Sequence, residues 1–301
     1  MPAPEHFNLY SPEALTLPDN ASDYFENRFA GKPKFMQDAL RDGCAYPLAD
    51  PDVSRLRRCL ASYYALISVI DMEIGRVLDF LEKSGQLDNT VIFYTADHGD
   101  FAGEHGLFHK NLGIYDSIHR IPFLLAWPGG PRATVAQQPV EAVDWYPTLC
   151  RLCNIPAPED IDGQSLVPLG QEAPKDAVFC EWDNCSAIRT NDWRLVLYRN
   201  TTEGELYDLR NDPGETCNRW DRPDLLPLRL SLVERLLRFS LGYSRRAGPW
   251  AFPYSPTQLV QFGRCYWSDL KAVYDTPGQW PPQSSQPGLE PSVTQRSSGV
   301  S

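Results

Sequence analysis

The sequence predicts an α/β layer fold followed by a small antiparallel sheet. A long helical pattern over residues 56–81 precedes two apolar runs, 90–96 and 121–127, that have the composition of strands. From residue 176 onward the pattern changes to short strands separated by turn residues. The order helix, strand, loop, strand indicates layered α/β structure, and the later change indicates the added sheet.

The helix is predicted from apolar residues spaced alternately four and three apart, which form one face. Asp50 before Pro51 marks the start of the helix, and Gly85 marks its end. We expect the apolar face to lie in the core. Its members are Leu56, Leu60, Tyr63, Ile67, Ile70, Ile74, Val77 and Leu81.

The run TVIFYTA, residues 90–96, is apolar throughout and rich in β-branched and aromatic residues. This composition is typical of a strand buried on both faces, as in a parallel sheet covered by helices. IPFLLAW, residues 121–127, is a second such run. The segment VDWYPTLCRLC, residues 143–153, is predicted as a short helix with Pro147 in its first turn.

Three domains are predicted. Residues 1–175 form the α/β part. Residues 176–243 combine short antiparallel strands with the amphipathic helix LLPLRLSLVERLLRFSLGY. Residues 244–301 form a Pro-rich extension whose polar tail is predicted to be disordered.

Composition limits the partners. The net charge is −11 and no stripe of Lys or Arg exists, so nucleic acid is not an expected partner. No run reaches the roughly 18 apolar residues that a membrane span requires. The first twenty residues have no basic region followed by an apolar one, so no signal peptide is expected and the cytoplasm is favoured. Oligomeric state stays open.

The strongest chemical signal follows the first strand. Asp97 and His98 stand where ligands gather in parallel α/β sheets, and Gly99 allows a sharp turn. Lys110 lies on the far side of a loop punctuated by glycines. If the loop folds back, a cation held by Asp97 and His98 and the Lys110 ammonium group clamp one oxyanion. The alternative, that Asp-His-Gly is only a turn, stays open on these residues alone.

These residues resemble the second signature region of the sulfatase family, in the alkaline phosphatase superfamily. That family carries D-[HN]-G, G-[DE]-H-G, a Lys and R-[IV]-P, which match Asp97–Gly99, Gly103–Gly106, Lys110 and Arg120–Pro122. Later segments match in order, among them ELYDLRNDPGE at residues 205–215. The resemblance implies part of an alkaline-phosphatase-like mixed or parallel sheet flanked by helices, plus a small C-terminal antiparallel sheet subdomain.

The resemblance also implies roles. Asp97 and His98 would ligate a divalent cation, usually Ca²⁺, and Lys110 would contact the sulfate group. For His105 it leaves two roles, direct substrate contact in catalysis or stabilisation of the loop. The expected activity is hydrolysis of sulfuric esters, on a small sulfate ester or a sulfated glycan. Hydrolysis of phosphonates or phosphodiesters is the alternative within the superfamily.

Three family features have no match in the printed sequence: the nucleophile motif, the upstream Asp-Asp pair that completes the metal site, and the His of the family's H-x-P segment. The sulfatase nucleophile is a formylglycine made from Cys or Ser in C/S-x-P-x-R, and no Cys or Ser of the printed sequence has that context. Cys44 and Cys153 each have Pro one place too late. We therefore expect the chain to correspond to the C-terminal portion of a sulfatase, to be inactive alone, and to expose apolar surface. A non-catalytic fragment is the competing interpretation.

Overall fold

The computed structural model describes residues 6, 8–41, 53–110, 112–158, 161–167, 175–182 and 184–243. The predicted extension over residues 244–301 therefore lies outside the described residues. The helices of four or more residues are α1 (Ser22–Asn27), α2 (Lys34–Arg41), α3 (Val53–Lys83), α4 (Asp116–His119), α5 (Trp145–Leu152) and α6 (Leu226–Tyr243). The strands are β1 (Ile92–Thr95), β2 (Phe123–Ala126), β3 (Ala177–Trp182), β4 (Cys185–Thr190), β5 (Trp193–Tyr198) and β6 (Gly204–Asp208).

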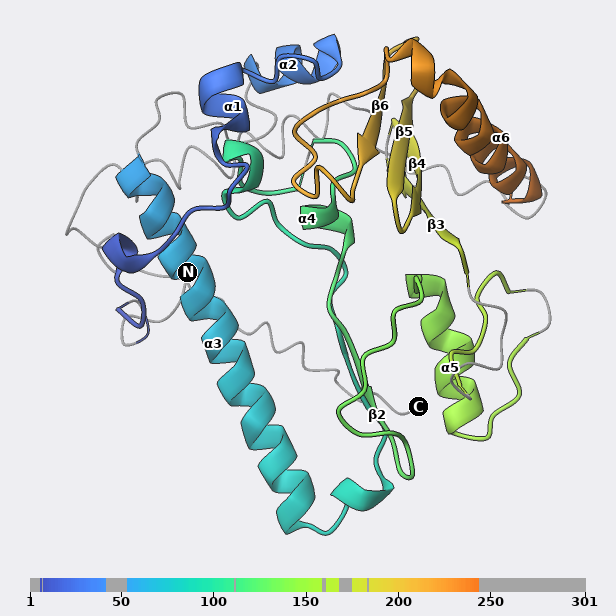
Figure 1. The fold of residues 1–301 in the computed structure, drawn as a ribbon. Coiled ribbons are helices and arrows are strands. Elements are labelled where there is room, and N and C mark those ends of the chain that lie inside the picture. Colours follow the sequence, from blue (N-terminus) through green and yellow to red (C-terminus); the bar gives the residue numbers. More distant parts are fainter. Residues whose placement is uncertain are drawn as a thin grey trace, which may run out of the picture. The chain divides into compact units, whose positions relative to one another are not determined.

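The four strands β3 to β6 form one antiparallel sheet in sequential order, as predicted. Alternate residues of each strand face opposite sides, and both sides are covered. On one side, Ile188 and Leu195 pack against Leu232 and Leu236 of α6, which runs alongside the sheet (Figure 1). β6 is buried at every position, with Leu206 in this cluster and Tyr207 in the cluster on the opposite side of the sheet.

The other side of the sheet packs against the segment that follows β1. Ala187, Val196 and Tyr207 share a cluster of buried side chains with Phe101 and Ile118. Residues from the predicted 1–175 and 176–243 parts therefore contribute to one core cluster. The division of the chain into those parts stays a prediction.

The apolar runs at 90–96 and 121–127 form β1 and β2, but the details differ from the prediction. The strands pair antiparallel, with Ile92 opposite Ala126 and Thr95 opposite Phe123. Neither is buried on both faces, since Tyr94 and Leu124 are exposed. The physical reason is the connection between them, which folds into a loop and the single turn α4 instead of the crossover helix that parallel strands need. The α/β class itself is confirmed.

The long helix is confirmed as α3, but only the first part of its predicted core face is buried. Leu56 and Leu60 are 0% and 1% exposed. Farther along the same face Ile67, Ile70 and Val77 are 47%, 51% and 59% exposed. The prediction of a fully buried face is wrong for this second half, because the described segments with the most contacts to α3, Pro12–Ala14 and Leu87–Asn89, leave much of it uncovered.

This exposure predicts unequal effects of two truncations in α3. Leu56→Ala should lower the free energy of unfolding by about 2–5 kcal/mol, because it opens a cavity in a packed core. Phe80, 65% exposed, should tolerate Ala within about 0.5 kcal/mol. Denaturant unfolding of the purified chain measures both. A loss for Phe80→Ala as large as that for Leu56→Ala would contradict an exposed face.

Candidate functional site

The structure brings Asp97, His98 and Lys110 together just beyond the end of β1. The imidazole Nε2 of His98 lies 3.3 Å from Asp97 Oδ2 and hydrogen-bonds the ammonium group of Lys110. Asp97 is largely exposed, whereas His98 and Lys110 are half-buried. The predicted folding back of the loop is therefore present in the structure.

The hydrogen bonds of His98 define its tautomer. Its Nδ1 lies 2.8 Å from the carbonyl oxygen of Gly99, which can only accept, so Nδ1 carries the proton. Nε2 is then the unprotonated nitrogen and accepts a hydrogen bond from Lys110. In metal sites, a hydrogen bond from the ring nitrogen that does not bind the metal, here Nδ1, commonly fixes the orientation of the histidine ring. His98 is thus prepared to offer a lone pair to a cation or to a donor.

Asp97 is held in its ionised form. The backbone N–H of His98 donates to Asp97 Oδ1 at 3.0 Å and lowers the pKa of the carboxyl, and the positive charge of Lys110 lowers it further. Two donors that bind one ion at about 2.1 Å lie about 3 Å apart, so this pair has a suitable spacing. Yet the described residues contain no group of three or more His, Cys, Asp or Glu placed to hold a metal. Since Ca²⁺ takes about six to eight oxygens, these residues alone do not complete a site for it.

Gly99 joins the site to the segment before β2. Its N–H donates to the carbonyl oxygen of Ile118 at 2.7 Å. A Cβ at this position would lie 2.0 Å from the carbonyl oxygen of Ser117, so only glycine fits. This close backbone approach positions Asp97 and His98 against the turn α4.

His105 occupies a different environment. It is 1% exposed, and its Nδ1 lies 2.9 Å from Asp23 Oδ2. Its ring packs against Phe101 and Tyr115, and no contact with Asp97, His98 or Lys110 is present among the described residues. These contacts correspond to the loop-stabilising role rather than to substrate contact. The catalytic assignment of His105 stays a prediction without a supporting contact.

Burial of His105 predicts that stability falls in mild acid. Burial lowers the pKa of His105 to about 4, against the opposing effect of Asp23. Between pH 6.5 and pH 4 the unfolded chain therefore binds a proton that the folded chain does not, so stability is full above this window and is lost as the pH falls through it. From about pH 7.5 to about pH 5 the free energy of unfolding should fall by roughly 2 kcal/mol from this group.

Denaturant unfolding at the two pH values measures this effect, and His105→Gln is the control that removes the titrating group. The variant should show a smaller loss between the two pH values. A residual slope is expected from His119, whose pKa burial also lowers to about 4. An unchanged slope in His105→Gln would contradict the assignment.

Sequence reasoning missed the residues that fasten α4 to the four-stranded sheet. Asp116 accepts two hydrogen bonds from Arg189, both 2.9 Å long, and one of 3.3 Å from Arg194. Its own backbone N–H donates to Glu215 Oε2 at 2.9 Å. Glu215 also pairs with Arg194. These partners lie roughly 70–100 residues away in sequence, and no local pattern could have linked them.

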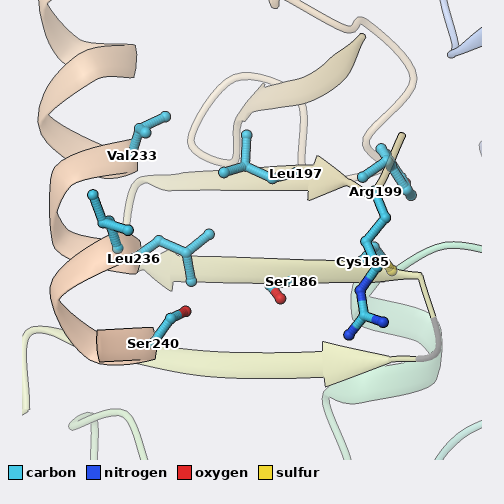
Figure 2. Close-up of a pocket in the computed structure, with 9 residues that line it drawn as sticks. Cys185, Ser186, Leu197, Arg199, Val233, Leu236 and Ser240 are labelled. Carbon is cyan, nitrogen blue, oxygen red and sulfur yellow. The ribbon is translucent and has the colours of Figure 1, made fainter. Parts of the chain in front are cut away.

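A hollow lies between α6 and the sheet. It measures about 250 Å³ and is lined on the strands by Cys185, Ser186 and Leu197, and on the helix by Val233 and Leu236 (Figure 2). Its lining is mainly apolar, and it includes no residue of the segment 97–119. Asp97, His98 and Lys110 therefore do not line this hollow.

The comparisons with known proteins agree on a family. The family model described as sulfatase matches residues 9–155, and the model described as N-sulphoglucosamine sulphohydrolase, C-terminal, matches residues 103–241. The curated N-acetylglucosamine-6-O-sulfatase of Bacteroides thetaiotaomicron is 32% identical over 199 residues, which cover 60% of this chain and 36% of that protein. The chain belongs to the sulfatase family, in the alkaline phosphatase superfamily. It spans little more than a third of that relative's length.

Solved structures confirm the alkaline-phosphatase-like fold. A protein solved in complex with its substrate D-glucosamine-2-N,6-O-disulfate is 25% identical, with a TM-score of 0.63 over 82% of this chain and 63% of that chain. A phosphonate monoester hydrolase from Silicibacter pomeroyi is 26% identical, with a TM-score of 0.67 over 80% of this chain and 53% of that chain. None of the described helices is long and apolar enough to cross a membrane.

Proposed function

We propose that this chain carries the sulfate-recognition part of a sulfatase site that acts on a sulfated sugar. The observation that carries the proposal is the meeting of Lys110, His98 and Asp97 at the end of β1, from positions on both sides of one loop. Sulfatases generally use a divalent metal. We propose Asp97 and His98 as two of its ligands, with Ca²⁺ as the expected ion.

Lys110 has the central role in this proposal. The chain carries a net charge of −11, which opposes the approach of any anion. An ammonium group placed in a half-buried position supplies the local positive charge that an ester sulfate requires. In this structure the ammonium group lies beside the site through its hydrogen bond to His98 Nε2. A cation bound to that nitrogen would take the place of this hydrogen bond and leave the ammonium group free to donate to a sulfate oxygen.

The sugar substrate is inferred from relatives. One is named for the 6-sulfate of N-acetylglucosamine, and another was solved with a doubly sulfated glucosamine. Turnover requires a nucleophile, and no Cys or Ser in the printed sequence has the formylglycine context. We therefore propose that this chain, by itself, recognises sulfate without hydrolysing the ester. Phosphonate ester hydrolysis is the second candidate, favoured by the likeness to the Silicibacter enzyme.

Titration with inorganic sulfate at constant ionic strength tests the role of Lys110. Lys110→Ala should weaken sulfate binding by about tenfold or more, because a charge-assisted contact is lost. Lys34→Ala is the matched control, since Lys34 is a well-exposed lysine paired with Asp38. Equal affinity of wild type and Lys110→Ala for sulfate would refute the proposal.

Assays of turnover separate the candidates. The purified chain is incubated with an aryl sulfate and with a phosphonate monoester, each with Ca²⁺ and with a chelator. We expect no release of sulfate or of the phosphonate ester's alcohol. Chelator-sensitive sulfate release that Lys110→Ala abolishes would contradict the proposed inactivity, and cleavage of the phosphonate ester alone would favour the second candidate.

A further inference from the structure

The loop that leads to Lys110 contains three strained residues. Ala102, His105 and His109 have φ values of 46°, 52° and 69°, in the left-handed region that residues other than glycine rarely adopt. Such conformations persist only where the surrounding structure holds them. His109 directly precedes Lys110, so its backbone conformation sets the direction in which the lysine side chain leaves the loop.

One carboxylate holds two of these strained residues. Oδ1 of Asp100 accepts a hydrogen bond from the backbone N–H of Ala102 at 2.8 Å and another from the backbone N–H of His109 at 3.2 Å. The backbone N–H of Phe101 donates to the carbonyl oxygen of His109 at 3.0 Å. The start and the end of the loop are thus closed against each other at Asp100.

We propose that Asp100 is a positioning residue that directs the Lys110 ammonium group toward bound sulfate. Asp100 acts through the backbone of His109 and has no contact with the Lys110 side chain among the described residues. The inference rests on the function proposed above, because it assigns a purpose to the direction of Lys110. Gly99, on the other side of Asp100, is fixed to Ile118, so the carboxylate is itself held in place.

The Asp100 carboxylate could affect sulfate binding through its charge or through its positioning of Lys110, and these two effects predict opposite changes in affinity when the carboxylate is removed. By Coulomb's law alone, a negative charge near an anion is unfavourable, so its loss would tighten sulfate binding. If Asp100 positions Lys110, loss of its acceptor oxygen weakens binding. Asn at this position keeps an acceptor oxygen and loses the charge, which separates the two effects.

Inorganic sulfate is titrated into the full chain at constant ionic strength and followed by amide NMR spectra, for wild type, Asp100→Ala, Asp100→Asn and Lys110→Ala. Asp100→Ala should bind sulfate roughly tenfold more weakly, as expected for lost bonds to a charged acceptor. Asp100→Asn should bind as tightly as wild type or more tightly. In wild type and Asp100→Asn the amides of Ala102 and His109 should be protected from hydrogen exchange, and this measurement remains if Asp100→Ala does not fold.

Weaker binding in Lys110→Ala together with undiminished binding in Asp100→Ala would overturn this inference and leave the proposed function intact. Unchanged binding in Lys110→Ala would refute the proposed function and this inference with it. Rapid exchange of the Ala102 and His109 amides in wild type would directly contradict the two hydrogen bonds to Asp100 on which the inference rests.

Discussion

Lys32→Ala is expected to lower the free energy of unfolding by about 3–5 kcal/mol, because it leaves buried carboxylates without their cation. The Lys32 side chain is 0% exposed. Its ammonium group donates to the hydroxyl of Tyr207 at 2.7 Å and to the carbonyl oxygen of Glu215 at 2.5 Å. Asp23 and Glu205 lie 3.6 Å and 4.0 Å from it.

Glu205 shows how strongly the region depends on this cation. The carboxylate is fully buried and accepts hydrogen bonds from three tyrosine hydroxyls, those of Tyr115, Tyr198 and Tyr207. Burial lowers the pKa of Lys32, against the raising effect of Glu205 and Asp23. Without Lys32, His105 is the side-chain partner that Asp23 keeps among the described residues, and burial keeps this histidine neutral by lowering its pKa to about 4.

Two variants complete the test by denaturant unfolding. Lys32→Met keeps most of the side-chain volume, so it separates the missing charge from the cavity, and it should still be strongly destabilising. Lys34→Ala removes a neighbouring lysine from an exposed pair and should cost less than about 1 kcal/mol. If Lys32→Met is as stable as wild type, the cluster does not depend on its cation.

The parts of the structure that local pattern determines were predicted from sequence. The period of apolar residues located α3, α6 and the strands, and the motif residues Asp97, His98 and Lys110 meet as expected. Those three residues lie at the two ends of one loop, so the conformation of that loop alone brings them together. The relative direction of β1 and β2 and the burial of their faces were harder to predict from sequence. An apolar run of four residues has the same composition in a parallel and in an antiparallel pair.

The ionic contacts that fix the site loop were not predicted, since they join residues far apart in sequence. Lys32 meets Tyr207 across 175 residues, and Asp116 meets Glu215 across 99. Charged residues in a sequence are usually solvated, so a pattern gives no reason to pair two of them. The matching segment ELYDLRNDPGE supplies two of these acids, Glu205 and Glu215. Their burial and their hydrogen-bond partners are known only from the structure.

Gly99→Ala is expected to abolish the geometry of the site while leaving most of the fold in place. The added Cβ would lie 2.0 Å from the carbonyl oxygen of Ser117 and 3.2 Å from the Cα of Ile118, both backbone atoms that cannot move aside as a flexible side chain does. The chain must separate by about 1 Å to relieve an overlap of this size, and overpacking typically costs about 1–3 kcal/mol. The hydrogen bond from Gly99 N–H to Ile118 should be lost with it.

The separation moves Asp97 and His98, because both lie within two residues of Gly99, whereas Lys110 stays with its own end of the loop. Since His98 must remain beside the Lys110 ammonium group for both to serve one anion, sulfate binding should weaken by about tenfold or more. Gly75→Ala is the matched control: a Cβ in this part of α3 meets nothing within 4 Å and should raise stability by about 0.5–1 kcal/mol. Thermal unfolding and sulfate titration measure both variants. Full sulfate affinity in Gly99→Ala would mean that the close approach of Gly99 to Ser117 does not set the site, and that Lys110 reaches the anion by another route.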